Sequence, residues 1–174
     1  MAVGIAVRRA LSELGCGGVQ LKWPNDLQIE GKKIAGILIE MTGDPLGEFT
    51  VIIGIGINYK LPQDSDEIIN QAHTDVASEW PEKEVSRNIL CGSVVNQLII
   101  VLLEFERHGL HSFVDEWQQA DAMMGQICTL NTATETYLGR VVGVTQRGAL
   151  RLLSSAGEEQ HFVGGELTLR PGRQ

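Results

Sequence analysis

The sequence predicts an α+β protein: a mixed or antiparallel sheet with packed helices, followed by a small β-barrel. Three observations lead to this prediction. An apolar pattern of helical spacing opens the chain, extended apolar runs fill residues 19–58, and short β-type runs divided by glycines follow residue 124. With 174 residues, 43% of them hydrophobic, the chain is long enough for one core and a satellite domain. We therefore predict two domains, residues 1–124 and residues 125–174.

The first segment predicts a helix that ends at Gly15. Glycine is common just past a helix C-terminus because it accepts a positive φ angle. The apolar residues of this segment recur with the helical period, and they are Ala2, Val3, Ile5, Ala6, Ala10, Leu11 and Leu14.

The next segment predicts an antiparallel hairpin that follows a short strand. Val19 to Leu21 is a β-type run, and Trp23 to Asp26 interrupts it, because proline removes a donor and Asn and Asp favour turns. Leu27 to Ile29 resumes the strand, residues 30–32 turn the chain, and Ile34 to Met41 runs back as a longer apolar strand.

Polar side chains gather at one edge of this predicted sheet. Lys22 and Lys33 lie near the strand ends, and Asn25 and Asp26 lie in the turn between them. Ammonium groups bind phosphate and carboxylate oxygens as point charges. A single exposed lysine is most often solvated, so it is the cluster that indicates a site for negative charge.

A second glycine-bearing strand follows. Residues 49–58 read as a buried strand in which alternation places Gly54, Gly56 and Asn58 on one face. A flat ligand could lie on such a bare face, with the Asn58 amide as donor and acceptor at its end. A β-bulge or close backbone packing would explain the glycines equally well. No third glycine opens a helix, so the pattern is not the dinucleotide-binding fingerprint.

The remaining part of the first domain predicts a polar excursion and two helices. Residues 60–85 are rich in polar groups and indicate a surface excursion with one strand or short turn. Apolar spacing predicts a long helix with a broad buried face from Ser86 to His108, ended by Gly109. A shorter helix is expected over His111 to Ala120, anchored by Phe113, Val114 and Trp117.

After residue 124 the sequence predicts a small barrel of SH3-like type. A domain of this size would be marginal alone, so we expect it to dock on the larger domain. The five predicted strands are Gln126–Leu130, Thr136–Thr145, Ala149–Leu153, Gln160–Val163 and Glu166–Leu169.

Charge and hydropathy argue against nucleic acid and membranes as partners. The formal net charge of −8 opposes general attraction to nucleic acid, and no helix-turn-helix pattern is present. The longest uninterrupted apolar run, Leu98 to Leu103, is too short to cross a bilayer. We expect a cytoplasmic protein with neither a nucleic-acid nor a membrane partner.

The cysteines and histidines predict no metal site. Cys16, Cys91 and Cys128 are odd in number and widely spaced, so they are expected to be reduced thiols, mostly in the core. His108 and His111 are three residues apart, but Gly109 between them breaks the helix that would align them. Two surface histidines are therefore favoured over a metal-binding pair.

Three motifs in this order resemble those of biotin protein ligases. They are Lys-Trp-Pro-Asn-Asp at 22–26, Lys-Ile-Ala-Gly-Ile-Leu at 33–38 and Gly-Ile-Gly-Ile-Asn at 54–58. Each motif alone is weak, whereas three in register are specific. The run Gly164 to Arg170 is similar to the closing strand of the family's terminal barrel.

The resemblance implies a partial class II synthetase-like catalytic domain followed by the SH3-like domain. It also implies a two-step reaction in which biotin and ATP, with Mg²⁺, form biotinoyl-5'-AMP. The biotinoyl group is then transferred to a lysine of the biotin carboxyl carrier protein of acetyl-CoA carboxylase.

The resemblance also assigns roles to residues. Lys33 corresponds to the essential lysine beside the biotin carboxylate and the α-phosphate, where positive charge offsets developing negative charge. Asn58 corresponds to a residue that reads adenine, and Arg170 to a terminal-domain arginine that reaches the nucleotide. The other implied substrate-binding residues are Lys22, Asn25, Asp26, Gly36, Ile37, Leu38, Gly54 and Gly56.

One family feature has no counterpart in residues 1–21, namely the Gly/Arg-rich loop that closes over biotin and phosphates. We therefore expect the chain to hold the C-terminal part of a ligase catalytic domain and to have weak or no activity alone. The edge at Ile39 to Gly47 is expected to pair in a homodimer. Two alternatives stay open: a lipoate ligase or octanoyl transferase, and a non-catalytic dimerising module.

Overall fold

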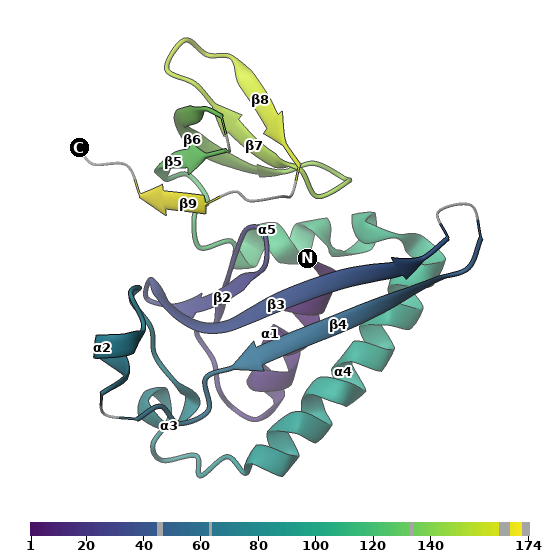
Figure 1. Cartoon of the computed structure of the whole chain (residues 1–174), viewed down its shortest axis with the longest axis vertical. Helices are drawn as coiled ribbons and strands as arrows, with labels where there is room; N and C mark the ends of the chain where they lie inside the picture. The colour runs from purple at the N-terminus through teal and green to yellow at the C-terminus, as the bar shows by residue number, and fades with distance from the viewer. Residues whose placement is uncertain (45–46, 63, 133, 164–167, 172–174) are drawn as a thin grey trace.

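The structure, a computed structural model, describes the chain except residues 45–46, 63, 133, 164–167 and 172–174. Its first sheet contains β1 (Gln20–Lys22), β2 (Asp26–Ile29), β3 (Lys32–Gly43) and β4 (Phe49–Ile57). All neighbours are antiparallel and the order is β1-β2-β3-β4; Figure 1 shows β2, β3 and β4 of this sheet. The predicted hairpin is thus confirmed. Its turn consists of Glu30 and Gly31, which both have a positive φ, of 48° and 79°.

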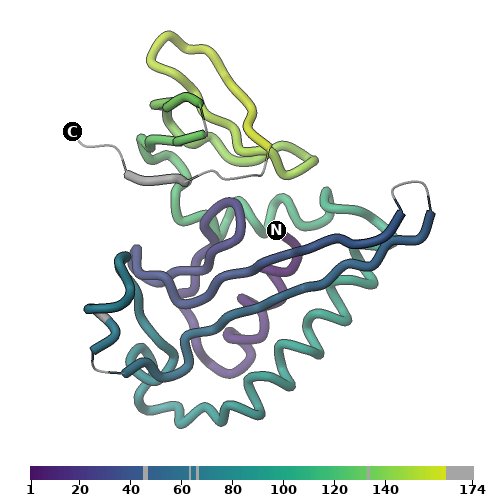
Figure 2. Tube along the Cα trace, viewed as in Figure 1, coloured from purple at the N-terminus to yellow at the C-terminus, as the bar shows by residue number. Residues whose placement is uncertain are grey.

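Two helices cover one face of this sheet and leave the other face open (Figures 1 and 2). Helix α1 (Ala2–Glu13) is buried along most of its length and packs beside α4 (Arg87–His108). Gly4 brings α1 close to the sheet, because a Cβ there would lie 3.3 Å from Leu21 Cδ2 and 3.6 Å from Ile37 Cδ1. The predicted N-terminal helix is confirmed, and it fixes the back of the sheet.

The prediction that β4 is buried is wrong, and so is the broad buried face of α4. Among the described strands, β4 is the last in its sheet, and its Phe49, Val51 and Ile52 are exposed. Helix α4 buries a narrow stripe of four residues, Leu90, Val94, Gln97 and Val101. Leu98 is partly buried beside this stripe, and most of the other apolar residues of α4 are exposed. By length and composition alone α4 is also long and apolar enough to cross a membrane, and 22% of that stretch is buried in the structure.

The segment of residues 60–85 is more ordered than a surface excursion. It contains α2 (Ser65–Ile68) and α3 (Val76–Glu79), and Thr74, Asp75 and Val76 are buried. Asp75 caps α3 by accepting a hydrogen bond from Ser78 N at 2.7 Å. Instead of the predicted strand or turn, a parallel bridge joins His73 to Lys33 of β3.

The second predicted helix of this region begins with one 3₁₀ turn, η1 (Leu110–Phe113), and continues as α5 (Val114–Ala120). Its anchors Phe113, Val114 and Trp117 are buried, as predicted. Glu116 faces α1, where its carboxylate accepts hydrogen bonds from the Arg9 guanidinium.

The C-terminal barrel contains β5 (Ile127–Asn131), β6 (Thr136–Val144), β7 (Leu150–Leu153), β8 (Glu159–Phe162) and β9 (Thr168–Pro171). All its pairs are antiparallel, in the order β8-β7-β6-β5-β9. The first four predicted strands are confirmed to within a residue or two. The last was predicted over Glu166–Leu169, of which residues 166–167 lie outside the described part. The α+β fold class is confirmed.

A buried carboxylate lies where α5 leads into the barrel. Asp121 is 7% exposed, and among the described residues its Oδ2 has no hydrogen-bond partner. Oδ1 accepts a hydrogen bond from Met123 N at 2.9 Å. Burial raises the pKa of Asp121 to about 6, although the Met123 N–H opposes the shift.

We expect Asp121→Asn to stabilise the protein at alkaline but not at acidic pH. The pKa of Asp121 is higher in the folded state than its ordinary value of 3.8. Below about pH 3.8 the carboxyl is protonated in both the folded and the unfolded protein, so the buried charge costs the folded state nothing. Stability is lost as the pH rises from there through about 6. Relief of the buried charge should raise the free energy of unfolding by about 2–3 kcal/mol at pH 8, with little change near pH 3. Urea denaturation at both pH values measures this, and an equal difference at the two would contradict it.

Candidate active site

One row of residues crosses the whole first sheet and contains four of the predicted site residues. Lys22 of β1 pairs with Asp26 of β2, Asp26 with Gly36 of β3, and Gly36 with Gly56 of β4. Residues directly opposite one another in antiparallel strands share a face of the sheet. The row therefore presents two charged side chains beside a floor without side chains.

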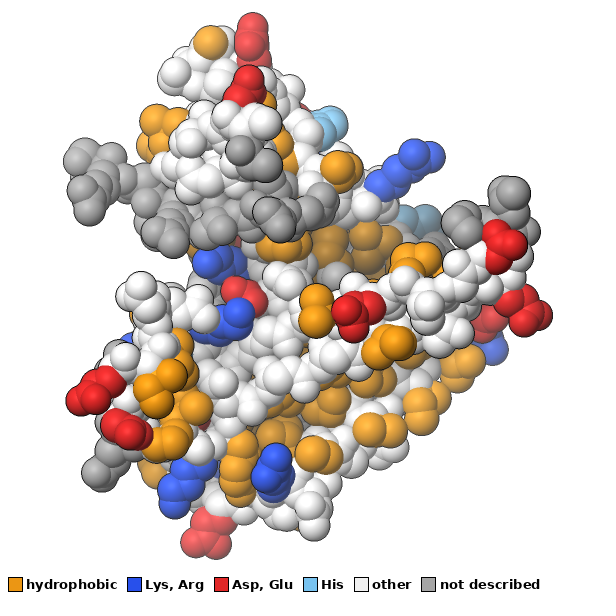
Figure 3. Space-filling model, in the orientation of Figure 1, with side chains coloured by type: hydrophobic (Ala, Val, Ile, Leu, Met, Phe, Trp, Pro, Cys, Tyr) orange, Lys and Arg blue, Asp and Glu red, His pale blue; other side chains and the backbone are white. Residues whose placement is uncertain are grey.

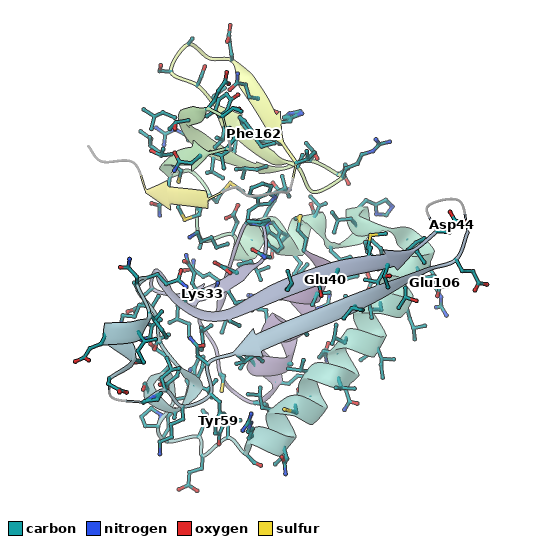
Figure 4. The ribbon with its side chains drawn as sticks, in the orientation of Figure 1. Lys33, Glu40, Asp44, Tyr59, Glu106 and Phe162 are labelled. Carbon is teal, nitrogen blue, oxygen red and sulfur yellow. The ribbon has the colours of Figure 1, made fainter. Side chains whose placement is uncertain are left out.

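Lys33 joins this row through an ion pair. Its Nζ lies 2.6 Å from Asp26 Oδ1, and both side chains are partly buried, with 31% and 22% of their surface exposed. The register shift between Leu27 and Gln28 locally interrupts the pairing of β2 with β3. Figure 4 shows Lys33 near the end of β3 that lies below the barrel.

Gly36 provides the space in which this ion pair lies. A Cβ at this position would be 3.1 Å from both Lys33 Cε and Lys33 Nζ, and 3.4 Å from Asp26 Oδ1. At Gly56 the nearest atom to such a Cβ is Gly36 O, at 3.9 Å. Gly36 therefore accommodates the lysine, whereas Gly56 leaves open floor beside it.

Asn25 holds the turn before β2 against β3. Its Nδ2 donates to Ile37 O at 2.7 Å, and Ile37 N donates to Asn25 O at 3.0 Å. Asn25 thus fixes the backbone that precedes Asp26. One of its amide N–H groups is bound to this backbone carbonyl, so the structure supports a positioning role for Asn25.

Asn58 ties β3 to the segment after β4. Its Nδ2 donates to Lys33 O at 3.2 Å and to Thr74 O at 2.9 Å. Both amide hydrogens are thereby used, and a contact with adenine would have to be made by Oδ1. The adenine-reading role stays a prediction, whereas a role in fixing the Lys33 backbone follows from the contacts.

Two shallow depressions meet at the ion pair. One, of about 460 Å³, is lined by the Asn25–Asp26 turn and by residues of β3 and β4 that include Leu38 and Gly54. The other, of about 330 Å³, is lined by Asn58 together with Ile69, Gln71 and His73. Both include Lys33, Gly36 and Gly56. Figure 3 shows charged side chains in the hollow between the sheet and the barrel.

The two ends of this joint depression differ in character. The end toward Leu38 and Gly54 is mostly apolar and has the bare floor predicted from the glycines. The regular β3–β4 register, from Ala35 with Ile57 to Gly43 with Phe49, has no bulge that would explain them otherwise. The end toward Asn58 and His73 carries amide and imidazole groups. An apolar acyl chain fits the first end, and a polar base the second.

His73 and Gln71 were missed by the sequence analysis. The His73 ring lies 3.0 Å from Ser65 Oγ through Nε2 and 2.9 Å from Gln71 O through Nδ1. Lys33 N donates to Ala72 O at 2.9 Å, which draws this segment alongside β3. No periodicity or motif marks these residues, because tertiary contacts alone bring them to the site.

The barrel approaches the site from the side of Lys22. The pKa of the Cys128 thiol in β5 is raised to about 11, first by burial and then by the Asp121 carboxylate, while the Lys22 charge lowers it. Arg170 lies on β9, where its backbone pairs with Thr129 of β5. The side chain of Arg170 lies outside the described part, so its contact with a nucleotide stays a prediction.

Carboxylates are sparse around these depressions. Within the described part of the chain, no three His, Cys, Asp or Glu side chains are grouped so that they could hold a metal ion. Asp26 is the carboxylate that lines the larger depression. Mg²⁺ usually binds through one or two carboxylates together with substrate phosphates, and this donor set fits an ion that arrives with a nucleotide.

Sequence comparisons match two parts of the chain to two families. Residues 2–58 match the biotin/lipoate A/B protein ligase family, and residues 124–170 match the biotin protein ligase C-terminal domain. The chain is 31% identical over 170 residues to the bifunctional ligase/repressor BirA of Escherichia coli strain K12. This alignment covers 98% of the chain and 52% of the relative. The chain therefore spans about half the length of that relative.

Other relatives and solved structures agree. A biotin–[acetyl-CoA-carboxylase] ligase of Paracoccus denitrificans is 27% identical over 165 residues, covering 87% of this chain and 67% of its own length. The crystal structure of a biotin protein ligase from Aquifex aeolicus superposes with a TM-score of 0.84 at 25% identity, covering 98% of this chain and 73% of that one. The Aquifex protein in complex with biotin and ATP has the same TM-score at 24% identity, covering 98% and 70%.

Proposed function

Because the chain belongs to the biotin protein ligase family, we propose that it carries the part of a biotin ligase that activates biotin with ATP and transfers it to a carrier lysine. The observation that supports this most is the Lys33–Asp26 ion pair at the junction of two depressions. A reaction that joins an apolar acid to a nucleotide needs a cation where the two meet.

In the first step, a biotin carboxylate oxygen attacks the α-phosphorus of ATP. A bond forms between that oxygen and phosphorus, the bond to the bridging oxygen breaks, and pyrophosphate leaves. Lys33 would offset the negative charge on the α-phosphate while this exchange occurs, and Asp26 keeps its ammonium in place at 2.6 Å. The product is biotinoyl-5'-AMP.

In the second step, a neutral lysine amine of the carrier attacks the acyl carbon of biotinoyl-5'-AMP. An amide bond forms, AMP leaves, and the amine gives up a proton. The Paracoccus relative is named for acetyl-CoA carboxylase, which supports the biotin carboxyl carrier protein of that enzyme as the partner. We propose that both steps take place in the cytoplasm.

We propose that Mg²⁺ enters with ATP. Its chemistry there would be to neutralise phosphate charge. Asp26 is the residue best placed to contact the hydration shell of such an ion, since it lines the depression at the ion pair.

The proposal is tested by ATP- and biotin-dependent adenylate formation, and by biotin transfer to an apo carrier. The 174-residue chain should be assayed beside an extended form that also carries the family's Gly/Arg-rich loop region upstream. Biotinoyl-5'-AMP formed by either would support the proposal, with the extended form expected to be the faster. Octanoate preferred over biotin would instead identify a lipoyl-type enzyme, and inactivity of both forms would favour a non-catalytic module.

We also propose that the protein forms a homodimer through the edge of β3. Strand β2 and the preceding Asn25 cover this edge of β3 only as far as Ile37, and Leu38, Ile39 and Met41 beyond it are exposed. An uncovered strand with apolar side chains readily pairs with another strand. Met41→Lys should shift analytical ultracentrifugation profiles toward monomer, in the presence and absence of biotin and ATP. A monomeric unaltered chain under both conditions would reject this edge as an interface.

A further inference from the structure

The segment from β1 to the turn before β2, which precedes Asp26 of the ion pair, is attached to the barrel at two points. Ala122 N, at the entry to the barrel, donates to Leu21 O at 2.9 Å, beside a parallel bridge between Leu21 and Asp121. Two residues further along the chain, just after β1, Trp23 Nε1 donates to Gly148 O at 2.9 Å. The first contact lies near the covalent connection, whereas the second joins residues 125 positions apart.

Both partners of the Trp23–Gly148 hydrogen bond are tightly packed. Trp23 is 2% exposed, so its indole N–H is not hydrated and relies on Gly148 O as its hydrogen-bond partner. A shift of the barrel that broke this bond would leave a buried donor without its partner. Gly148 closes the turn between β6 and β7, where its N donates to Thr145 O at 2.9 Å and its φ is +82°. A Cβ at Gly148 would lie 2.7 Å from Met1 Sδ and 2.8 Å from Leu110 Cδ2. The β6–β7 turn therefore packs against Met1 and Leu110 of the first domain with no room for a side chain at residue 148.

We propose that Trp23 is a positioning residue that latches the barrel over the active site. The latch links the barrel to the turn that carries Asn25 and Asp26, and through Asp26 to Lys33. Strand β9, with the backbone of Arg170, belongs to the same barrel sheet as the latched β6–β7 turn. An unlatched barrel would move β9 relative to the sheet, and with it Arg170, the residue that the family resemblance assigns to the nucleotide. The effect on nucleotide affinity rests on the proposed function, whereas the latch itself rests on geometry alone.

Trp23→Phe tests the latch, and Trp117→Phe is the matched control. The first removes an indole N–H that has a partner. The second removes one that is buried and has no hydrogen-bond partner within the described residues, with a similar loss of ring volume. Hydrogen exchange of residues 119–126 and 145–149 is measured relative to β7, together with ATP and biotin affinity by calorimetry.

For Trp23→Phe we expect exchange in both segments to accelerate about 5-fold relative to β7, as the loss of one hydrogen bond predicts. ATP affinity should fall by a similar factor, with biotin affinity unchanged. Trp117→Phe should change global stability, but it should not change the exchange of residues 119–126 or 145–149 relative to β7. Equal acceleration in the two variants, or none in Trp23→Phe, would overturn the latch.

Gly148→Ala provides a second variant, because its methyl group would meet Met1 Sδ and Leu110 Cδ2, and a side chain at φ +82° also strains the turn itself. We therefore expect faster exchange in residues 119–126, outside that turn, and the double variant Trp23→Phe/Gly148→Ala should be no worse there than the more severe single one. Additive effects would contradict a shared latch. If the unaltered chain and its extended form bind no ATP, the proposed function fails, while the exchange ratios still decide the latch.

Discussion

Lys33→Ala is expected to reduce adenylate formation by at least about 100-fold, the scale of loss seen when one electrostatic contact to a developing charge is removed. The reason is positional, because Lys33 Nζ is the cation held 2.6 Å from Asp26 where the two depressions meet. The measurement is biotin-dependent exchange of pyrophosphate into ATP by the extended form, with the 174-residue chain beside it.

The matched control is Lys32→Ala, which removes the same side chain one position earlier, where it is exposed. It should leave the exchange rate within about 2-fold, because exposed charges are well screened. Urea denaturation should show little change for either variant, since the Lys33–Asp26 pair is partly exposed and weakly stabilising. Adenylate formation retained by Lys33→Ala would reject the role assigned to this lysine.

Gly36→Val is expected to reduce the same activity on the order of 100-fold, because small misplacements of a catalytic group have effects of this size. The valine side chain would occupy the space of Lys33 Cε and Nζ, which lie 3.1 Å from the position of its Cβ. Lys33 would then leave Asp26. Valine is favoured in strands, so far-UV circular dichroism and the urea midpoint should change little.

Gly92→Val serves as the control for adding the same side chain elsewhere. No atom lies within 4 Å of a Cβ at this α4 position, so activity should be retained. Gly56→Val separates the two functions of the floor. It should weaken biotin binding while leaving the Lys33–Asp26 pair in place, because the nearest atom to its Cβ is Gly36 O at 3.9 Å. Full activity of Gly36→Val would show that Lys33 does not need its present position.

Much of the fold is readable from local patterns. Alternation and turn residues predicted the hairpin from Leu27 to Met41, and helical spacing with Gly109 predicted α4 and its end. The glycine-divided runs predicted the barrel. These features depend on neighbours within a few residues, so a single sequence contains the information.

Burial was predicted less well, because it depends on what packs against each element. The apolar residues of β4 and α4 suggested deep burial, yet β4 is an edge strand among the described residues and α4 packs through one stripe. Residues 60–85 suggested a surface loop, but the bridge between His73 and Lys33 makes part of this segment a wall of the site.

The sequence by itself determined the residue types of the site and their spacing: Lys22, Asn25, Asp26, Lys33 and the glycines near one sheet edge. Only the tertiary structure decided which of these side chains fix the backbone and which face the depressions. Asn25 and Asn58 turn their amide N–H groups to backbone carbonyls, and Trp23 turns its indole to Gly148. The physical reason is that a hydrogen bond or an ion pair depends on distances between atoms far apart in the chain, and local sequence does not encode those distances.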